Sequence, residues 1–307
     1  MTGNKYNNLS DIFRQALAGQ AVNINDRSLV QQNQLMFLLP GAVEYHRKFW
    51  QSVNQLNQLL DKTACRHLFI KTIKPYPYND GNIDVVCATE EDFSRAVVVA
   101  RKAGRQATMS YHEPDKIMFR LYTDTVEQKP AWHLHRAVSW NGVNYLGNQS
   151  LFADRIMATS DGVTIPVPGP AHAILINAGH ALFENFVIPL GELYDTSENS
   201  ILIDNWPQIY AEARQSGWER GLMNYLSLIA SLAAELGFRH ALPADIKPSK
   251  IKLRLPLPIP LTQQLKAFAE RLGYNCRYRH YRYVCRESYA YPLFYLIEKF
   301  KHLIRYE

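Results

Sequence analysis

The stretch from Leu68 to Cys87 constrains the fold of this chain more than any other part of the sequence. Its residues, LFIKTIKPYPYNDGNIDVVC, form two short apolar runs on either side of a polar connection that contains two prolines. Short apolar and β-branched runs separated by turn residues predict two strands. An acidic residue, Asp84, stands inside the second run, where a carboxylate is costly unless cations or hydrogen bonds offset its burial. The stretch therefore predicts a strand pair whose carboxylate is either functional or simply ion-paired.

Length and composition place the chain among globular proteins. Its 307 residues are enough for one large domain or two smaller ones. No apolar run approaches the length of about 18 residues that a membrane span needs. The N-terminus has no apolar signal-peptide core, so we expect a cytoplasmic protein without a membrane span. The four cysteines form no C-x-x-C pair, which argues against a zinc knuckle or a disulfide framework.

Helical and strand patterns alternate along the rest of the chain. Apolar residues recur at helical spacing in segments 10–19, 42–60, 90–104, 169–186, 206–236 (with a break near 216–217) and 261–274. Strand-like runs follow the opening pair at 116–123, 131–140 and 162–168, and a hairpin is expected at 139–145. Strands with helices between and after them predict an α+β fold in which helices flank a mixed sheet.

Changes in secondary-structure pattern and in charge divide the chain into four predicted parts. They are an N-terminal helical segment at 1–62, an α/β core at 63–168, a helical domain at 169–242 and a basic, aromatic and partly helical C-terminal segment at 243–307. The last part carries 13 Lys and Arg against 5 Asp and Glu, whereas the remainder carries 21 against 23. Its interleaved arginines and tyrosines suit phosphate contact and base stacking, although a strand with its tyrosines packed inward explains the same string. The segment is a candidate surface for RNA or for a protein partner.

Four short motifs in this order resemble those of the nucleotidyltransferase superfamily, whose minimal fold is shared with DNA polymerase β. They are Ile70-Lys71-Thr72, Asn82-Ile83-Asp84, His133-Leu134-His135 and the run HALFE from His180 to Glu184. The resemblance covers roughly residues 63–240. In that superfamily a Lys-Gly or Gly-Ser turn precedes a D-x-D strand, and a third carboxylate often stands just before a Leu-His pair. The resemblance implies a nucleotidyltransferase-like mixed sheet and transfer of a nucleoside monophosphate from an NTP to an acceptor, with Mg²⁺ as cofactor.

Carried over position by position, the resemblance implies a role for each motif residue. Asp84 becomes the main catalytic metal ligand, assisted by Asn82 and Asp80, and His133 takes the place of the third metal ligand. Alternation along a strand puts residues i and i+2 on one face, so an N-x-D pair faces the same ions. A nucleotide triphosphate with bound Mg²⁺ needs oxygen ligands on the metal and positive charge on the phosphates. The phosphate-binding candidates are Lys71, Thr72 and Lys74.

Three departures from the superfamily pattern leave two hypotheses open. Asn82 is neutral where a carboxylate is usual, His133 prefers softer metals than Mg²⁺, and Thr72 replaces the Gly-Ser turn. The first hypothesis is an active nucleotidyltransferase. The second is a catalytically inactive protein of the same fold that binds a nucleotide, RNA or a protein partner. His133 and His135 share a strand face, which is compatible with a metal pair or with ordinary strand histidines.

One further pair is expected on the helix at 169–186. His180 and Glu184 are one helical turn apart, so we expect them to bond each other beside the core.

Overall fold

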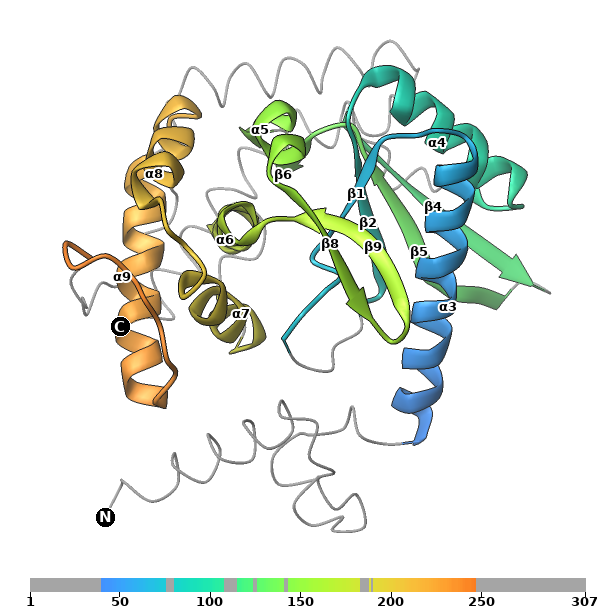
Figure 1. The fold of residues 1–307 in the computed structure, drawn as a ribbon. Coiled ribbons are helices and arrows are strands. Elements are labelled where there is room, and N and C mark those ends of the chain that lie inside the picture. The colour runs from blue at the N-terminus through green and yellow to red at the C-terminus, as the bar shows by residue number, and fades with distance from the viewer. Residues whose placement is uncertain are drawn as a thin grey trace, which may run out of the picture.

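A five-stranded mixed sheet is the centre of the fold in the computed structural model (Figure 1). The structure describes residues 40–75, 80–107, 115–123, 126–140, 143–182, 188 and 190–246. Within these residues helices cover both faces of the sheet, so the expected α+β class is confirmed. The expected helices at 10–19 and 261–274 and the basic C-terminal segment lie outside the described residues.

The strand order in the sheet is β1-β2-β5-β4-β3. The bounds are β1 (His67–Ile70), β2 (Asn82–Cys87), β3 (Gln106–Ala107), β4 (Lys116–Thr123) and β5 (Val126–His135). β2 and β5 run parallel, and the other neighbouring pairs are antiparallel. The two apolar runs of the 68–87 stretch therefore pair with each other, as predicted. The register sets Ile70 opposite Asp84 on one side and His133 opposite Asp84 on the other.

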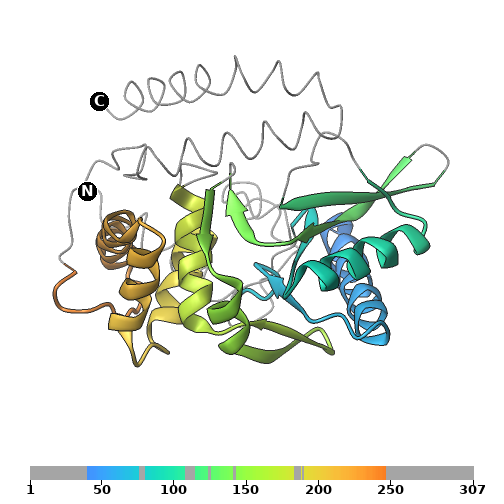
Figure 2. The same ribbon diagram turned by 90° about the horizontal axis from the view of Figure 1, so that it is seen from above.

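Alternation along β1 and β2 divides their side chains between two hydrophobic cores. Phe69, Ile83 and Val85 pack with the helices α3 (Pro40–Lys62) and α4 (Glu90–Lys102) on one face. Leu68, Ile70 and Val86 pack on the other face, in a core built mainly by helices α6 (Pro170–His180), α7 (Leu190–Ser200), α8 (Trp206–Gln215) and α9 (Glu219–Leu236). Figure 2 shows these two helical groups on opposite sides of the sheet. Asp84 alternates with Ile83 and Val85, so its side chain points toward the α6–α9 side.

Local chemistry explains where the flanking helices begin and end. The Thr89 hydroxyl caps α4 by accepting a hydrogen bond from the Asp92 backbone N–H, and three acidic residues occupy the first turn. Gly217, with φ of 80°, separates α8 from α9 at the break expected from the sequence. No helix among the described residues has both the length and the apolar character needed to cross a bilayer.

Smaller elements connect the sheet to the helices. They are β6 (Val138–Trp140) and β7 (Val143–Leu146), which form the expected hairpin, the short helix α5 (Asn148–Ala153), and the antiparallel ribbon of β8 (Arg155–Ser160) and β9 (Val163–Pro168). The strand expected at 131–140 is wrong in one respect, because the chain bends after His135 and continues as β6 in a separate sheet. β8 and α7 carry no strong apolar periodicity and were not expected.

Candidate functional site

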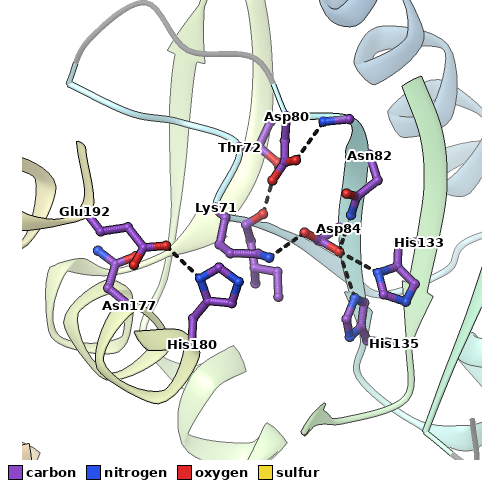
Figure 3. Close-up of polar contacts among 12 residues, drawn as sticks. Lys71, Thr72, Asp80, Asn82, Asp84, His133, His135, Asn177, His180 and Glu192 are labelled. Carbon is purple, nitrogen blue, oxygen red and sulfur yellow. Dashed lines mark hydrogen bonds and ion pairs between the residues drawn. The ribbon is translucent and has the colours of Figure 1, made fainter. Parts of the chain in front are cut away.

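Asp84 is the centre of a buried polar cluster on β2. Its side chain is 2% exposed, and its Oδ2 forms an ion pair with Lys71 Nζ at 2.9 Å. Its Oδ1 lies 2.8 Å from His133 Nδ1 and 3.0 Å from His135 Nε2. Asn82 Nδ2 donates to the same Oδ1 at 2.8 Å. Both carboxylate oxygens are therefore engaged by groups of the chain itself, as Figure 3 shows.

The sheet register explains why these side chains meet. Asp84 pairs with His133, and Val86 pairs with His135, across the parallel β2–β5 ladder. Side chains two residues apart on a strand share a face, so both imidazoles lie on the face of Asp84. Asn82 precedes Asp84 by two residues and reaches the same oxygen for the same reason.

Lys71 reaches Asp84 through an uncommon backbone conformation. β1 ends at Ile70, directly opposite Asp84, and Lys71 follows with φ of 60°. The left-handed region costs a residue with a Cβ about 1–2 kcal/mol. Strained residues of this kind persist where surrounding interactions hold them and are frequent at functional sites. The ion pair with Asp84 is the interaction that offsets the strain.

Charge and burial act in opposite directions on the groups of this cluster. Burial alone would raise the pKa of Asp84, but the Lys71 ammonium and the hydrogen bonds from His133 and His135 hold it well below its ordinary value. Burial, together with repulsion from His133, lowers the pKa of His135 to about 3. Asp84 is therefore an anion and His135 a neutral imidazole at neutral pH.

Two of the residues predicted to assist Asp84 or the phosphates bond elsewhere. Asp80 Oδ1 accepts from the Gly81 backbone N–H at 2.6 Å, and burial raises the pKa of the Asp80 carboxyl despite the nearby Lys71 charge. The Thr72 hydroxyl donates to the Ile70 carbonyl at 3.2 Å. Among the described residues no hydrogen bond joins Asp80 to Asp84, so Asp84 is the one carboxylate of the cluster.

Lys74 belongs to a second polar group between β1 and the helices. Its Nζ lies 2.8 Å from Asp195 Oδ2 on α7 and 3.3 Å from Asn177 Oδ1 on α6. Asn177 also donates to Asp195 at 2.8 Å. Neither Asn177 nor Asp195 was predicted as a site residue. Asp195 lies on α7, which was not expected, and Asn177 lies on the expected helix α6 without a sequence signal that points to Lys74.

A cavity of about 520 Å³ joins these groups. It lies between the end of β1, the β8–β9 ribbon and helices α6 and α7. The three predicted phosphate-binding residues, Lys71, Thr72 and Lys74, all line it, together with apolar side chains such as Phe69 and Ile176. Its volume is within the range of about 300–1,000 Å³ that is typical of small-molecule sites.

His180 on α6 is bonded to Glu192, a residue that was not among the predicted site residues. Its Nδ1 lies 2.6 Å from Glu192 Oε1 on α7, and both side chains are largely buried. Glu184, the expected partner, lies outside the described residues. Figure 3 shows the His180–Glu192 pair on the opposite side of Lys71 from Asp84. The wall that faces the Asp84 cluster is thus formed by α6 and α7.

The donor set decides which metal this cluster can hold. Asp84, His133 and His135 each offer one ligand atom, and the three atoms lie within 4.8 Å of one another. Mg²⁺ takes octahedral oxygen ligands and is usually bound through one or two carboxylates together with substrate phosphates. Two Mg²⁺ ions would here have to share the single Asp84 carboxylate, which two imidazoles and an ammonium already engage, so these residues do not fit a pair of Mg²⁺ ions.

Comparison with known proteins gives a distant structural likeness. No protein-family model and no curated protein matches the chain. Among solved structures, the chain is similar to the crystal structure of an antigenic nucleotidyltransferase-like protein from Paracoccidioides brasiliensis, with 11% identity and a TM-score of 0.38. The match covers 62% of this chain and 93% of that one. A likeness at this level does not carry an argument about activity, which has to come from the site.

Proposed function

We propose that this chain is a nucleotide-binding protein with a nucleotidyltransferase-like core that holds a nucleoside triphosphate in the cavity beside Lys71. We propose further that the chain does not bind the pair of Mg²⁺ ions that the superfamily uses for nucleotidyl transfer. One observation carries it, the 2.9 Å ion pair between Lys71 Nζ and Asp84 Oδ2. The ammonium supplies, next to the single carboxylate, the positive charge that a bound metal would otherwise supply.

Electrostatics supports this reading of the Lys71–Asp84 pair. The two side chains are 10% and 2% exposed, so their attraction is weakly screened by water. A Mg²⁺ ion at Asp84 would have to displace the ammonium or sit beside it, and it would gain only one anionic ligand in exchange. The geometry therefore favours the second of the two hypotheses from the sequence, a protein that binds without transferring.

The cavity supports a nucleotide as the ligand. Lys71 and Lys74, which follow β1, line it, and so does Arg239, which follows α9. Lysine and arginine N–H groups are the usual donors to phosphate oxygens. The apolar walls offer contact area for a base and ribose. The order of motifs shared with nucleotidyltransferases points to the same class of ligand.

Transfer of a nucleoside monophosphate to an RNA, protein or other acceptor is the competing hypothesis. It requires Asp84 to give up its contacts with Lys71, His133 and His135 and to bind metal instead. The basic segment 243–307, predicted to contact such an acceptor, lies outside the described residues beyond position 246, and its role stays a prediction.

ATP binding to the purified full chain tests the proposal. Leu202 lines the cavity and is 64% exposed, so Leu202→Glu adds a negative charge there without disturbing the core. We expect this change to weaken ATP binding about tenfold, because it repels the triphosphate. Val98→Glu is the matched control, since Val98 is 48% exposed on α4, across the sheet, and its variant should bind as the unaltered chain does.

Two outcomes of this titration would overturn the proposal. One is the absence of saturable ATP binding by the unaltered chain. The other is equal ATP affinity for Leu202→Glu and Val98→Glu, which would place the nucleotide away from the cavity.

A further inference from the structure

We propose that Asp84, His133 and His135 form a binding site for one divalent transition-metal ion of the zinc class. The site goes beyond the proposed nucleotide binding and does not depend on it. It uses an imidazole, that of His133, where the superfamily pattern has its third carboxylate, and it would select against Mg²⁺ rather than for it.

The donor set fits a borderline metal. Imidazole nitrogen suits Zn²⁺, Co²⁺, Ni²⁺ and Fe²⁺, and two histidines with one carboxylate are a common ligand set for zinc and non-haem iron. Among the described residues, this is the one group of three histidine, cysteine or acidic side chains close enough to share an ion. The cluster therefore differs in kind from the scattered acidic and histidine pairs elsewhere in the described chain.

The distances also fit. Metal–nitrogen and metal–oxygen bonds of about 2.0–2.1 Å place neighbouring ligand atoms about 2.9 Å apart in an octahedron and about 3.3 Å apart in a tetrahedron. The observed separations from Asp84 Oδ1 are 2.8 Å to His133 Nδ1 and 3.0 Å to His135 Nε2. All three ligand atoms lie within 4.8 Å of one another, which is close enough for them to share one ion. Binding requires the N–H proton of each ring to move to its other nitrogen or to solvent, since the metal takes the lone pair.

The ligands stand on a rigid support. All three come from neighbouring central strands in a fixed parallel register, and their side chains are 2%, 8% and 0% exposed for Asp84, His133 and His135 respectively. Asn82 borders the same oxygen and offers its carboxamide oxygen as a further ligand after rotation of the amide. His133 Nε2 is buried without a hydrogen-bond partner among the described residues. A closed structural network would pair that nitrogen, so the cluster is better explained as a binding site.

Lys71 makes the proposal distinguishable from nucleotide binding. Its ammonium, 2.9 Å from Asp84 Oδ2, repels a metal at Oδ1 but attracts phosphate. Lys71→Met should therefore tighten metal binding and weaken ATP binding. A common loss of both would indicate unfolding instead.

The test is a Zn²⁺ titration of the chelator-treated full chain against a competing indicator, with Co²⁺ absorption as the spectroscopic readout. We expect one equivalent of Zn²⁺ that excess Mg²⁺ does not displace. His133→Ala and His135→Ala should each lower the Zn²⁺ affinity by at least about 100-fold. Even the loss of a residue that only hydrogen-bonds to a metal ligand lowers metal affinity by about 10- to 100-fold. Lys71→Met should bind Zn²⁺ about tenfold more tightly than the unaltered chain.

His172→Gln is the matched control. His172 is a buried histidine that bridges two carboxylates elsewhere in the fold, so its loss tests for general damage without touching the proposed ligands. This variant should retain the Zn²⁺ equivalent and the cobalt spectrum. Far-ultraviolet circular dichroism confirms that each variant compared is folded.

Three results would overturn the site. They are no Zn²⁺ equivalent in the unaltered chain, displacement of Zn²⁺ by Mg²⁺, and unchanged Zn²⁺ affinity in the folded His133→Ala and His135→Ala variants.

Discussion

Two clusters of histidine and carboxylate in this protein are built in opposite ways around a buried central side chain. In the sheet cluster (Lys71, Asp84, His133 and His135) one carboxylate is shared by two imidazoles and an ammonium. In the helix clamp (Asp154, His172 and Glu212) one imidazole is shared by two carboxylates, at 2.8 Å from Asp154 Oδ2 and 3.0 Å from Glu212 Oε2. The first joins strands of one sheet, whereas the second ties the end of α5 to α6 and α8.

The difference separates a candidate binding site from a structural connection. Both ring nitrogens of His172 are bonded, and although burial opposes protonation, Glu212 and Asp154 together raise the pKa of His172. His135 has its pKa lowered to about 3 instead. The helix clamp is thus a charged bridge with each nitrogen paired, while the sheet cluster gathers several donors on one anion and leaves His133 Nε2 unpaired among the described residues. Surplus donors around a single buried anion are what a ligand or metal can rearrange.

The largest effect should come from removing the anion of the sheet cluster. Asp84→Ala leaves the Lys71 ammonium buried without its carboxylate, and losing one partner of a buried ion pair costs about 3–5 kcal/mol. The free energy of unfolding from urea titration measures this loss. Asp161→Ala removes an exposed carboxylate paired with His46 and should cost only about 0–1 kcal/mol. Equal losses of unfolding free energy in the two variants would contradict the prediction, because the buried Asp84 pair would then stabilise the fold no more than an exposed pair.

A smaller effect should come from crowding the helix clamp. Gly169 is the N-cap of α6, and an added Cβ there would lie 2.7 Å from the backbone carbonyl oxygen of Asp154 and also collide with its carboxylate. We expect Gly169→Ala to destabilise the fold by about 1–3 kcal/mol, because the Asp154 backbone cannot yield freely. Gly147, the N-cap of α5, has its nearest atom at 3.9 Å, so Gly147→Ala should change the unfolding free energy by about 0.5 kcal/mol or less. A Gly169→Ala chain as stable as Gly147→Ala would contradict the described packing of Asp154.

The most modest effect is a pH dependence of the helix clamp. Since the folded-state pKa of His172 is raised above its ordinary 6.5, the stabilisation is complete below pH 6.5 and is lost as pH rises through the raised pKa. His172→Gln should lose about 1–3 kcal/mol at acid pH, the usual contribution of hydrogen bonds to a charged group, and less at alkaline pH. Unfolding free energies of both chains across this range check the sign. A difference that grows with pH would show that His172 is neutral in the folded protein.

Local patterns predicted most of the fold. The periodic apolar residues at 42–60 and 206–236 identified α3 and the α8–α9 pair, because helix packing repeats at a fixed spacing. Helix α7 was missed since its polar side chains are buried and bonded within the helix and to α9, as with Ser197 to the Leu193 carbonyl and Thr196 to Tyr225. Because these buried positions are polar residues with hydrogen-bond partners, the helix shows no periodic apolar pattern in the sequence.

The candidate site was predictable only where its residues are close in sequence. Strand alternation put Asn82 and Asp84 on one face, and their side chains do meet. The contact between Asp84 and His133 needs parallel pairing across 49 positions, and the Lys74–Asp195 pair spans 121. Neither partner can be chosen from spacing alone, because many histidines and acids are available at such separations. The resemblance suggested His133 as a metal ligand but did not indicate that Lys71 would form an ion pair with Asp84.

The central claim is that Lys71, paired with Asp84, stands where the superfamily's catalytic Mg²⁺ ions would bind, so that nucleotide is held without transfer. The most direct measurement is incorporation of label from α-labelled NTPs with Mg²⁺, into the chain itself or into added RNA, using protein already shown to bind ATP. We predict that ATP remains bound and that no label is transferred. Mg²⁺-dependent transfer that disappears in Asp84→Asn and persists in the exposed-site control Asp161→Asn would contradict the account.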